Sequence, residues 1–374
     1  MNLDFSDEQN ELRQQVRRFL EDRCPPKAVR AILESDAQYD PELYAGLAEL
    51  GVLGAAIPEE YGGVGLGHLE LCVVAEELGR VLAPVPVASS IYLAAECLLQ
   101  AGSEEQKSAW LRRLASGDAI GCWAINEGSG RMRAEKGTAK FEGGRLTGMK
   151  SPVADGAIAN FAIVLAQDGD GQSLCLVDLS ADGVSRESLN SIDPTRGQAR
   201  LSFDGAPAAL LGAAGAGWHI ATQVMDRAAI LLGFEQLGGA DRALEMARDY
   251  ALERMAFGRQ IGSFQAIKHM LADMYVSATL ARSNCYYGAW ALATSAAELP
   301  IAAATVRVSA TNAFQHCAKN NIQTHGGMGF TWEFDCHLYY RRSNALALAL
   351  GSLSTWESLL IERMGAGNLE AAAA

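Results

Sequence analysis

The feature that most constrains this chain is a change of hydrophobic period that occurs twice along the sequence. A helical period comes first and begins where Ser6 and Gln9 form a capping box. Short apolar runs at 161–166 and 173–177 follow, separated by turns rich in Gly and Asp. The helical period returns after the glycine-containing stretch 212–217. Helices, strands and helices in separate blocks predict an α+β fold, not the alternation of a doubly wound sheet.

These blocks predict how the 374 residues are divided. A chain of this length has room for two or three domains with a large core. We expect an N-terminal helical domain at 1–119, a central β domain at 120–213, a C-terminal four-helix bundle at 214–364 and a flexible tail at 365–374. Ala- and Leu-rich segments predict the bundle helices at 218–257, 264–297, 301–323 and 345–363.

Charge and hydropathy exclude several classes of partner. With 31 basic and 44 acidic residues, the chain has a net charge of −13, which argues against binding to nucleic acid or to an anionic membrane. No apolar run approaches the roughly 18 residues that span a bilayer. The polar start of the chain lacks the pattern of a signal peptide. We therefore expect a cytoplasmic protein with neither a nucleic-acid nor a membrane partner.

The cysteines and histidines predict no covalent or metal scaffold. Eight cysteines are scattered along the chain without a Cys-x-x-Cys pair, which is typical of reduced, buried thiols. His316, His325 and His337 lie near Cys317 and Cys336, but no metal-ligand spacing connects them. We expect neither a disulfide framework nor a metal site.

Two short motifs suit the phosphates of a dinucleotide, although the chain has no Gly-x-Gly-x-x-Gly fingerprint and no Walker lysine. The first contains Arg254 and Gly258, and the simplest explanation is a helix end with a basic last turn and a glycine cap. That explanation does not account for Phe257 or Gln265. The second motif, 323–329, is either a plain helix stop or a set of exposed backbone amides. An arginine fork with exposed amides suits a pyrophosphate.

Four stretches in order carry a family resemblance: 57–66, 76–80, Arg254-x-x-Phe-Gly with Gln265, and Gln323-x-x-Gly-Gly-x-Gly. On these motifs the sequence resembles the acyl-CoA dehydrogenase flavoprotein family over residues 5–364. The resemblance implies a helical N-terminal domain, a β domain and a C-terminal four-helix bundle. It also implies FAD as cofactor, an acyl-CoA thioester as substrate and an electron-transfer flavoprotein as electron acceptor.

The family uses a carboxylate as catalytic base, and its commoner position falls here on Leu350, which cannot accept a proton. The alternative family position, a glutamate before an arginine, falls on Asp226 before Arg227. Two explanations of Asp226 stay open. It is either a shortened base or an acid near a helix start, where the helix dipole favours negative charge.

The stretches that hold the flavin ring in the family are altered in this chain. Asn126, Glu127 and Gly128 are followed by Arg131, Met132 and Arg133, where the family usually has Thr-Glu-Pro followed by Gly-Ser-Asp. Pro152-Val153-Ala154 replaces an aromatic residue and a Thr or Ser beside the ring. Arg131, Arg133 and Lys136 either meet the phosphates of CoA or form a solvated basic edge.

The retained motifs are those that reach a neighbouring subunit's FAD in the family. Their residues are Arg254, Phe257, Gln265, Gln323, Gly326, Gly327 and Gly329. The chain thus keeps the residues that reach a neighbour's FAD and loses those that contact its own flavin ring. This is the pattern that the degenerate subunit of a heterotetramer would show. Residues 262–269 resemble the heteromeric branch that acts on steroid side-chain thioesters. Two alternatives remain: a self-sufficient homo-oligomer with Asp226 as base, and a flavin-free scaffold or thioester-binding protein.

Overall fold

The computed structural model describes residues 4–128 and 137–373. Its internal contacts divide the chain into two compact units. The first, the bundle unit, comprises 1–30, 69–83 and 229–374; the second, the sheet unit, comprises 31–68 and 84–228. Helix α7 (Gly217–Glu253) contributes its first turns to the sheet unit and the remainder to the bundle unit. The predicted boundaries at 119 and 213 fall between elements, and the division into three domains stays a prediction.

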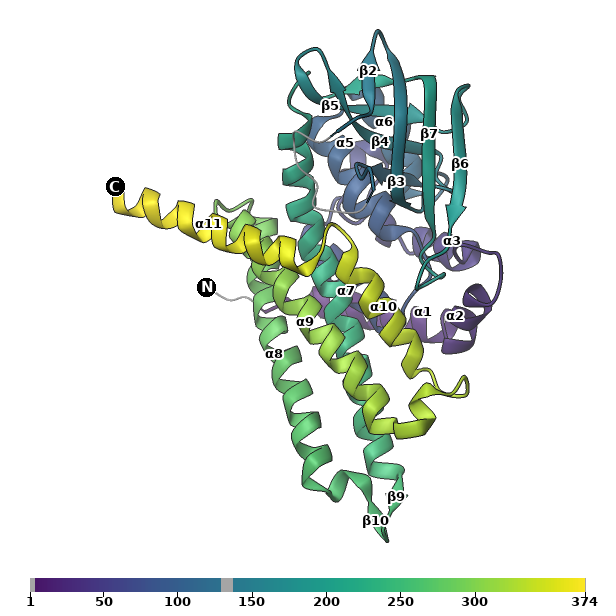
Figure 1. Cartoon of the computed structure of the whole chain (residues 1–374), viewed down its shortest axis with the longest axis vertical. Coiled ribbons are helices and arrows are strands. Elements are labelled where there is room, and N and C mark those ends of the chain that lie inside the picture. Colours follow the sequence, from purple (N-terminus) through teal and green to yellow (C-terminus); the bar gives the residue numbers. More distant parts are fainter. Residues whose placement is uncertain (1–3, 129–136, 374) are drawn as a thin grey trace. The chain divides into compact units, whose positions relative to one another are not determined.

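Helices dominate the bundle unit (Figure 1). Helix α1 begins at the predicted capping box, where the Ser6 hydroxyl accepts from the backbone N–H of Gln9 and the Gln9 side chain accepts from the Ser6 N–H. Helix α9 contacts α8, α10 and α11. The elements are α1 (Asp7–Arg23), α2 (Pro26–Leu33, which begins here), α4 (His68–Arg80), α8 (Gln265–Ala293), α9 (Leu299–His325), α10 (Cys336–Leu348) and α11 (Leu353–Ala373), with a hairpin of β9 (Met255–Ala256) and β10 (Arg259–Gln260) between α7 and α8.

The predicted last helix at 345–363 is wrong as a single element. Helix α10 already begins at Cys336, and the chain breaks before α11 because Leu350 and Gly351 have φ angles of 59° and 104°. A helix cannot continue through two residues in that region. Helix α11 then runs on to Ala373, past the start of the tail that we expected to be flexible from 365.

Glycines bring α4 and α7 into backbone contact within the bundle unit. A Cβ added at Gly79 would overlap the carbonyl oxygen of Glu235, and one added at Gly238 would overlap that of Glu76. Both positions therefore require the smallest residue for packing, since interiors leave no spare volume. This close contact fixes the position of α4, and hence of its side chains, against α7.

Two buried acids of α4 are neutralised by arginines of the same unit. Glu76 accepts from Arg13 at 2.6 Å and from Arg282 at 2.8 Å. Glu77 accepts from Arg17 at 2.8 Å and 2.7 Å. Burial alone would raise the pKa of Glu76, but the charges of Arg13 and Arg282 hold that pKa below its ordinary value. The network therefore ties α1, α4 and α8 together.

Among the described residues, an eight-stranded sheet forms the centre of the sheet unit (Figure 1). Its order is β6-β7-β3-β2-β4-β5-β8, and β1 pairs with β4 in parallel. The antiparallel pairing of β4 with β5 confirms the strands predicted at 161–166 and 173–177. The strands are β1 (Gly121–Ala124), β2 (Lys140–Glu142), β3 (Arg145–Ala154), β4 (Phe161–Asp168), β5 (Gly171–Asp178), β6 (Val184–Leu189), β7 (Gln198–Pro207) and β8 (Ala209–Leu211). Helices α3 (Pro41–Glu49), α5 (Glu96–Ala101) and α6 (Glu104–Ala115) and a π-helix at Ala88–Ala95 belong to the same unit.

Three further findings bear on the classes that the sequence excluded. Within residues 4–128 and 137–373, no helix combines the length and apolar character that crossing a bilayer requires. All eight cysteines are buried thiols. The side chains that the structure describes include no group of three His, Cys, Asp or Glu residues placed to hold a metal ion.

Candidate functional site

The hairpin after α7 carries the first predicted motif. Arg254 follows the end of the helix, where its N–H donates to the Tyr250 carbonyl at 2.8 Å and its carbonyl accepts from Ile261 at 2.8 Å. Phe257 and Gly258 form the turn with φ angles of 50° and 78°, which glycine adopts freely but phenylalanine only at a cost of about 1–2 kcal/mol. The Phe257 side chain is also 96% exposed. A strained and exposed aromatic residue indicates a function outside the folding of the chain itself.

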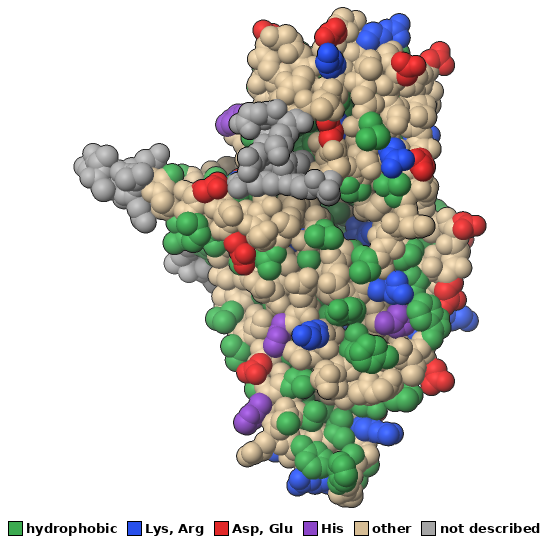
Figure 2. Space-filling view, viewed as in Figure 1, with side chains coloured by type: hydrophobic (Ala, Val, Ile, Leu, Met, Phe, Trp, Pro, Cys, Tyr) green, Lys and Arg blue, Asp and Glu red, His purple; other side chains and the backbone are tan. Residues whose placement is uncertain are grey.

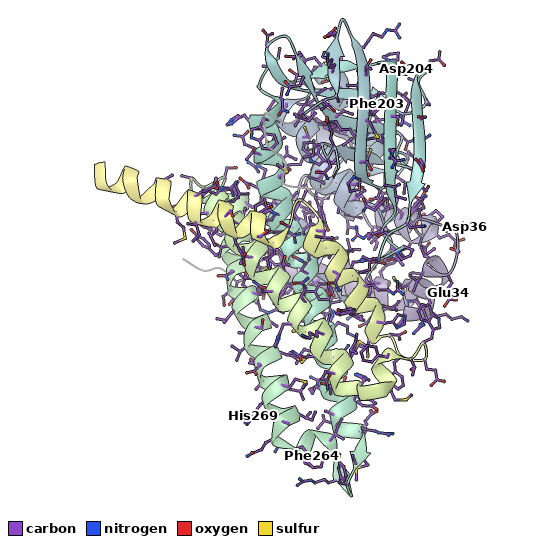
Figure 3. The ribbon with its side chains drawn as sticks, in the orientation of Figure 1. Glu34, Asp36, Phe203, Asp204, Phe264 and His269 are labelled. Atoms are coloured by element: carbon purple, nitrogen blue, oxygen red, sulfur yellow. The ribbon has the colours of Figure 1, made fainter. Side chains whose placement is uncertain are left out.

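Ring contacts hold the hairpin against the start of α8. The rings of Phe257 and Phe264 meet edge to face at 6.1 Å, and the Arg259 guanidinium lies 4.1 Å from the centre of the Phe264 ring. Figure 3 marks Phe264 at this end of the bundle unit. Gln265 is the first residue of α8 and is exposed. The exposed side chains of Arg254, Phe257 and Gln265 therefore come from one continuous, supported segment.

The second predicted motif forms the turn between α9 and α10. Gln323 is exposed near the end of α9, and Gly326 has a φ of 61°. A Cβ at Gly329 would lie 2.6 Å from the Ile322 carbonyl oxygen, so packing requires glycine there. A Cβ at Gly326 or Gly327 would meet nothing within 4 Å. The backbone at these two glycines is therefore open to the approach of another molecule.

One ring pair connects the two motifs in space. Tyr250 stacks on His325, with ring centres 4.1 Å apart and planes 23° from parallel. The Tyr250 carbonyl accepts from Arg254, and His325 directly precedes Gly326, so the pair links hairpin and turn. In Figure 1 both motifs lie toward the end of the bundle unit that β9 and β10 mark, and Figure 2 shows hydrophobic side chains gathered there.

The donors at this end of the bundle unit fit the anionic half of a dinucleotide. Arg254 is exposed and offers a planar fork of N–H donors for phosphate oxygens. No Cβ shields the backbone at Gly326 and Gly327. Gln265 and Gln323 add exposed amides that can both donate and accept. These residues can hold the phosphates and ribose of a group such as the ADP half of FAD.

The two altered flavin-ring stretches lie side by side in the sheet unit. Ser151 donates its N–H to the Asn126 carbonyl at 2.9 Å, and Gly128 donates to the Ser151 carbonyl at 2.7 Å. The side chains of Pro152 and Ala154 contain no hydrogen-bond donor. The changes read separately from the sequence therefore affect one neighbourhood. The predicted basic residues Arg131, Arg133 and Lys136, with Met132, lie outside the described residues.

An ion pair stabilises the retained Glu127 beside these changes. Glu127 accepts from the buried Lys150 at 2.5 Å and from Thr138 and Ala139. Burial alone would raise the pKa of Glu127, but the hydrogen bonds from Lys150 and Thr138 are among those that lower it to about 2. Glu127 therefore anchors the altered stretch 126–128 to β3 through Lys150 and to the segment before β2 through Thr138 and Ala139.

The placement of Asp226 contradicts one of its two explanations. Asp226 lies in the third turn of α7, which begins at Gly217, and is 4% exposed. The helix dipole acts within the first turn, so it does not account for this acid. The next residue, Arg227, pairs with Glu96 at 3.5 Å, and Glu96 also binds His68 at 2.8 Å. Asp226 is therefore a buried carboxylate on an anchored helix.

Leu350 lies at the break between α10 and α11, where its carbonyl accepts from Trp356 Nε1 at 3.0 Å. Sequence reasoning missed the residue that caps this break. Arg307 of α9 is 1% exposed and donates to the Gln236 side chain at 2.6 Å and to the Ala349 carbonyl at 2.5 Å. Burial lowers the pKa of Arg307 to about 10. The signal was an arginine on the apolar face of an Ala-rich helix.

Comparison with known proteins agrees with this architecture. The family described as "Acyl-CoA dehydrogenase, N-terminal domain" matches residues 6–118, and "Acyl-CoA dehydrogenase, C-terminal domain" matches 215–364. Acyl-CoA dehydrogenase IpdE2 of Mycobacterium tuberculosis is 35% identical over 92% of this chain and 94% of its own length. The human mitochondrial short-chain specific acyl-CoA dehydrogenase is 32% identical over 85% of this chain and 82% of its own length.

Two solved structures share the fold over nearly the whole chain. A variant of the Tcur3481–Tcur3483 steroid ACAD superposes with a TM-score of 0.89 at 31% identity, covering 97% of this chain and 99% of that chain. The ChsE4–ChsE5 complex from Mycobacterium tuberculosis gives a TM-score of 0.87 at 29% identity, covering 99% of each chain.

Fold and matches together define a flavin-dependent oxidoreductase. The chain belongs to the acyl-CoA dehydrogenase family, whose members use FAD to oxidise CH–CH bonds of acyl-CoA thioesters. The predicted family, the α+β fold and the flavin dependence are thereby confirmed.

Proposed function

We propose that this chain is one subunit of a heteromeric acyl-CoA dehydrogenase and completes the FAD site of a homologous partner subunit. Its hairpin and glycine turn bind the ADP half of the partner's FAD, through Arg254, Phe257, Gln265, Gln323, Gly326, Gly327 and Gly329. The assembly is a heterotetramer of two complete and two degenerate chains.

The observation that carries the proposal is the state of Phe257. Its ring is 96% exposed and its backbone has a φ of 50°, so folding gains little from phenylalanine there beyond the edge contact with Phe264. Leu252 and Met255 beside it are 54% and 56% exposed. Exposed apolar side chains around a positive charge, Arg254, are typical of a contact surface for another subunit.

The altered stretches of the sheet unit support the same proposal, because they lack side chains that would hold a flavin ring. Pro152 and Ala154 offer neither a stacking surface nor a donor to a flavin ring, and Leu350 offers no base. FAD, when bound, supplies a hydride acceptor for the oxidation of the thioester. In our proposal this chain contributes phosphate binding and orientation, while the partner subunit supplies the ring site and the base.

The relatives support a bulky substrate. One similar structure is a variant of a steroid ACAD, and another is the complex of ChsE4 and ChsE5. We propose that the substrate is a CoA thioester with a steroid-like side chain, and that an electron-transfer flavoprotein accepts the electrons.

Flavin stoichiometry tests the proposal. The chain is expressed alone and together with a related dehydrogenase subunit, and bound FAD is counted per chain by absorbance. One FAD per two chains in the co-expressed assembly, lost on Arg254→Ala, is the expected result. A stoichiometric yellow homo-oligomer that dehydrogenates a CoA thioester contradicts it. A complex whose flavin does not depend on Arg254 supports a scaffold instead.

One observation favours the second candidate, a self-sufficient homo-oligomer. Asp226 is a buried carboxylate within a helix, which the dipole does not explain. A base that removes a proton from the carbon next to a thioester must sit in a water-poor site, and the buried position of Asp226 meets that condition. Asp226→Asn decides: it abolishes turnover of the isolated chain if Asp226 is the base, and turnover that persists excludes that role.

A further inference from the structure

A cluster of aromatic rings lies beneath the glycine turn of the bundle unit. His325 is 6% exposed and stacks on Tyr250 at 4.1 Å. Phe334 closes the cluster, with its ring perpendicular to that of Tyr250 at 5.9 Å and inclined to that of His325 at 5.5 Å. The three rings come from α7, α9 and the segment before α10. His325 and Phe334 each lie 75 residues or more after Tyr250 along the chain, so the cluster joins distant segments.

Hydrogen bonding fixes the His325 ring. Its Nδ1 lies 2.9 Å from the Asn321 carbonyl, which can only accept, so Nδ1 carries the proton. Burial lowers the pKa of His325, which keeps the ring neutral at pH 7. A neutral ring with one nitrogen bound to the helix backbone has a single orientation against Tyr250.

The third ring is held from the opposite side. The Phe334 carbonyl accepts from Arg30 at 3.1 Å and from His337 Nδ1 at 2.8 Å. Arg30 also binds Asp335 at 2.8 Å. The backbone of the segment that follows the glycine turn is therefore anchored by an ion pair and two hydrogen bonds, which fix the point from which the Phe334 ring reaches the cluster.

The glycine turn folds directly over the cluster. A Cβ at Gly329 would lie 3.1 Å from the His325 Cβ, whereas Gly326 and Gly327 face open space. The side of the turn that touches the rings is thus tightly packed, and the other side is accessible. Displacing the His325 ring would move the backbone of Gly326 and Gly327, the accessible part of the turn.

We propose that Tyr250 and His325 are positioning residues: their stacked rings hold the Gly326–Gly329 turn and Arg254 in the relative arrangement that binds the phosphates of a dinucleotide. The inference rests on the proposed function. Arg254 is tied to the pair through the Tyr250 carbonyl, and the glycine turn through the His325 backbone. Preorganised donors bind more tightly because their ordering is completed before the ligand arrives.

The test measures FAD affinity in the assembly of the full chain with its homologous partner, by flavin fluorescence. Tyr250→Leu and His325→Leu should each weaken FAD binding about tenfold without changing the size of the assembly. Tyr250→Phe keeps the ring and should bind FAD like the parent. If Tyr250→Phe loses as much affinity as Tyr250→Leu, or if neither leucine variant loses any, ring stacking does not position the site.

A matched control separates positioning from general stability. Tyr286 belongs to another aromatic cluster of the same unit, 5.1 Å from Phe5 and 6.3 Å from Phe234. Tyr286→Leu should lower the melting temperature and leave FAD affinity unchanged. If a leucine variant fails to assemble, amide hydrogen exchange at 326–329 in the isolated chain gives the answer, since Tyr250→Leu should accelerate it and unchanged exchange overturns the inference.

Arg254→Ala distinguishes this inference from the proposed function. If Arg254→Ala leaves FAD affinity unchanged, the proposed function itself fails. If Arg254→Ala weakens binding while the leucine variants do not, only the positioning role fails.

Discussion

Phe257→Gly should leave the folding of the isolated chain nearly unchanged and weaken its assembly with a partner. Phe257 is the position where the structure separates these two properties most clearly, because its ring is 96% exposed and its φ is 50°. A residue selected for folding would be buried or would be glycine. The size of each effect follows from the contacts described above.

For folding, opposing contributions nearly cancel. Glycine relieves about 1–2 kcal/mol of left-handed strain. It adds roughly 0.5–1 kcal/mol of conformational entropy to the unfolded chain. The lost edge-to-face contact with Phe264 at 6.1 Å is worth about 0.5–1.5 kcal/mol. We therefore expect the free energy of unfolding to change by no more than about 1.5 kcal/mol, the limit that those three ranges allow.

For assembly, nothing offsets the loss. Burying a phenylalanine side chain that was exposed contributes about 1.5–3 kcal/mol. Removing it should raise the dissociation constant of the subunits by roughly 10- to 150-fold, since 1.4 kcal/mol corresponds to a factor of ten. Bound FAD should fall with the assembly, because the hairpin also presents Arg254.

The assay combines urea denaturation of the isolated chain with analytical ultracentrifugation of the mixed subunits. Leu66→Ala is the control, since Leu66 is 56% exposed but lies outside the hairpin and the glycine turn. Phe257→Gly that assembles as tightly as Leu66→Ala refutes the argument that exposure and strain mark a contact. A loss of stability well beyond about 1.5 kcal/mol also refutes it, because the ring would then support the fold itself.

The remaining predictions concern the network around Glu76 and two contrasting glycines. Glu76→Gln removes the carboxylate that Arg13 and Arg282 share, while Arg13 keeps Glu77 and Arg282 keeps Asp241. It should lower the free energy of unfolding by about 1.5–3 kcal/mol in urea titrations, the value of a hydrogen bond to a charged group; unchanged stability would mean that the network contributes little. Because the folded state depresses the pKa of Glu76, its contribution is present above pH 4.5 and is lost as pH falls through the lower folded value. As the pH is lowered, the free energy of unfolding of Glu76→Gln should therefore decrease less steeply than that of the parent chain. Gly238→Ala should lower the free energy of unfolding by about 1–3 kcal/mol, because the added Cβ overlaps a carbonyl oxygen. Gly327→Ala adds a Cβ that meets nothing, so this variant should keep the melting temperature of the parent but bind FAD less tightly. The opposite pattern would contradict our assignment of the two positions.

Local signals were enough to predict much of the fold. The capping box at Ser6 and the alternating turns around β4 and β5 are encoded within a few residues. The sequence does not predict the break at Leu350 because leucine favours a helix, whereas in the folded chain Arg307 caps the Ala349 carbonyl and Trp356 caps that of Leu350. Local propensity cannot reveal a partner such as Arg307, which lies 42 residues from Ala349 along the chain.

The candidate site likewise contains residues that the sequence predicts and residues that only the folded chain brings together. The residues with exposed donors, such as Arg254 and Gly327, follow from motifs that can be read along the chain. The Tyr250–His325 pair does not, because its members are 75 residues apart and each has an ordinary local setting. From the sequence, His325 is either a metal ligand or, as the spacing favours, a structural residue, and the ring contact that gives it a more specific role exists only after folding. The predicted helix at 218–257 already places Asp226 beyond its first turn, but the burial of Asp226 cannot be read from its neighbours in the sequence.

The exposed Phe257, with Leu252 and Met255 beside it, also affects how a cell must handle this polypeptide. In the proposed assembly the partner subunit covers these side chains, so a copy without that partner would expose an apolar surface to chaperones and proteases. The abundance of this chain in vivo should therefore follow the supply of its companion and not its own rate of synthesis.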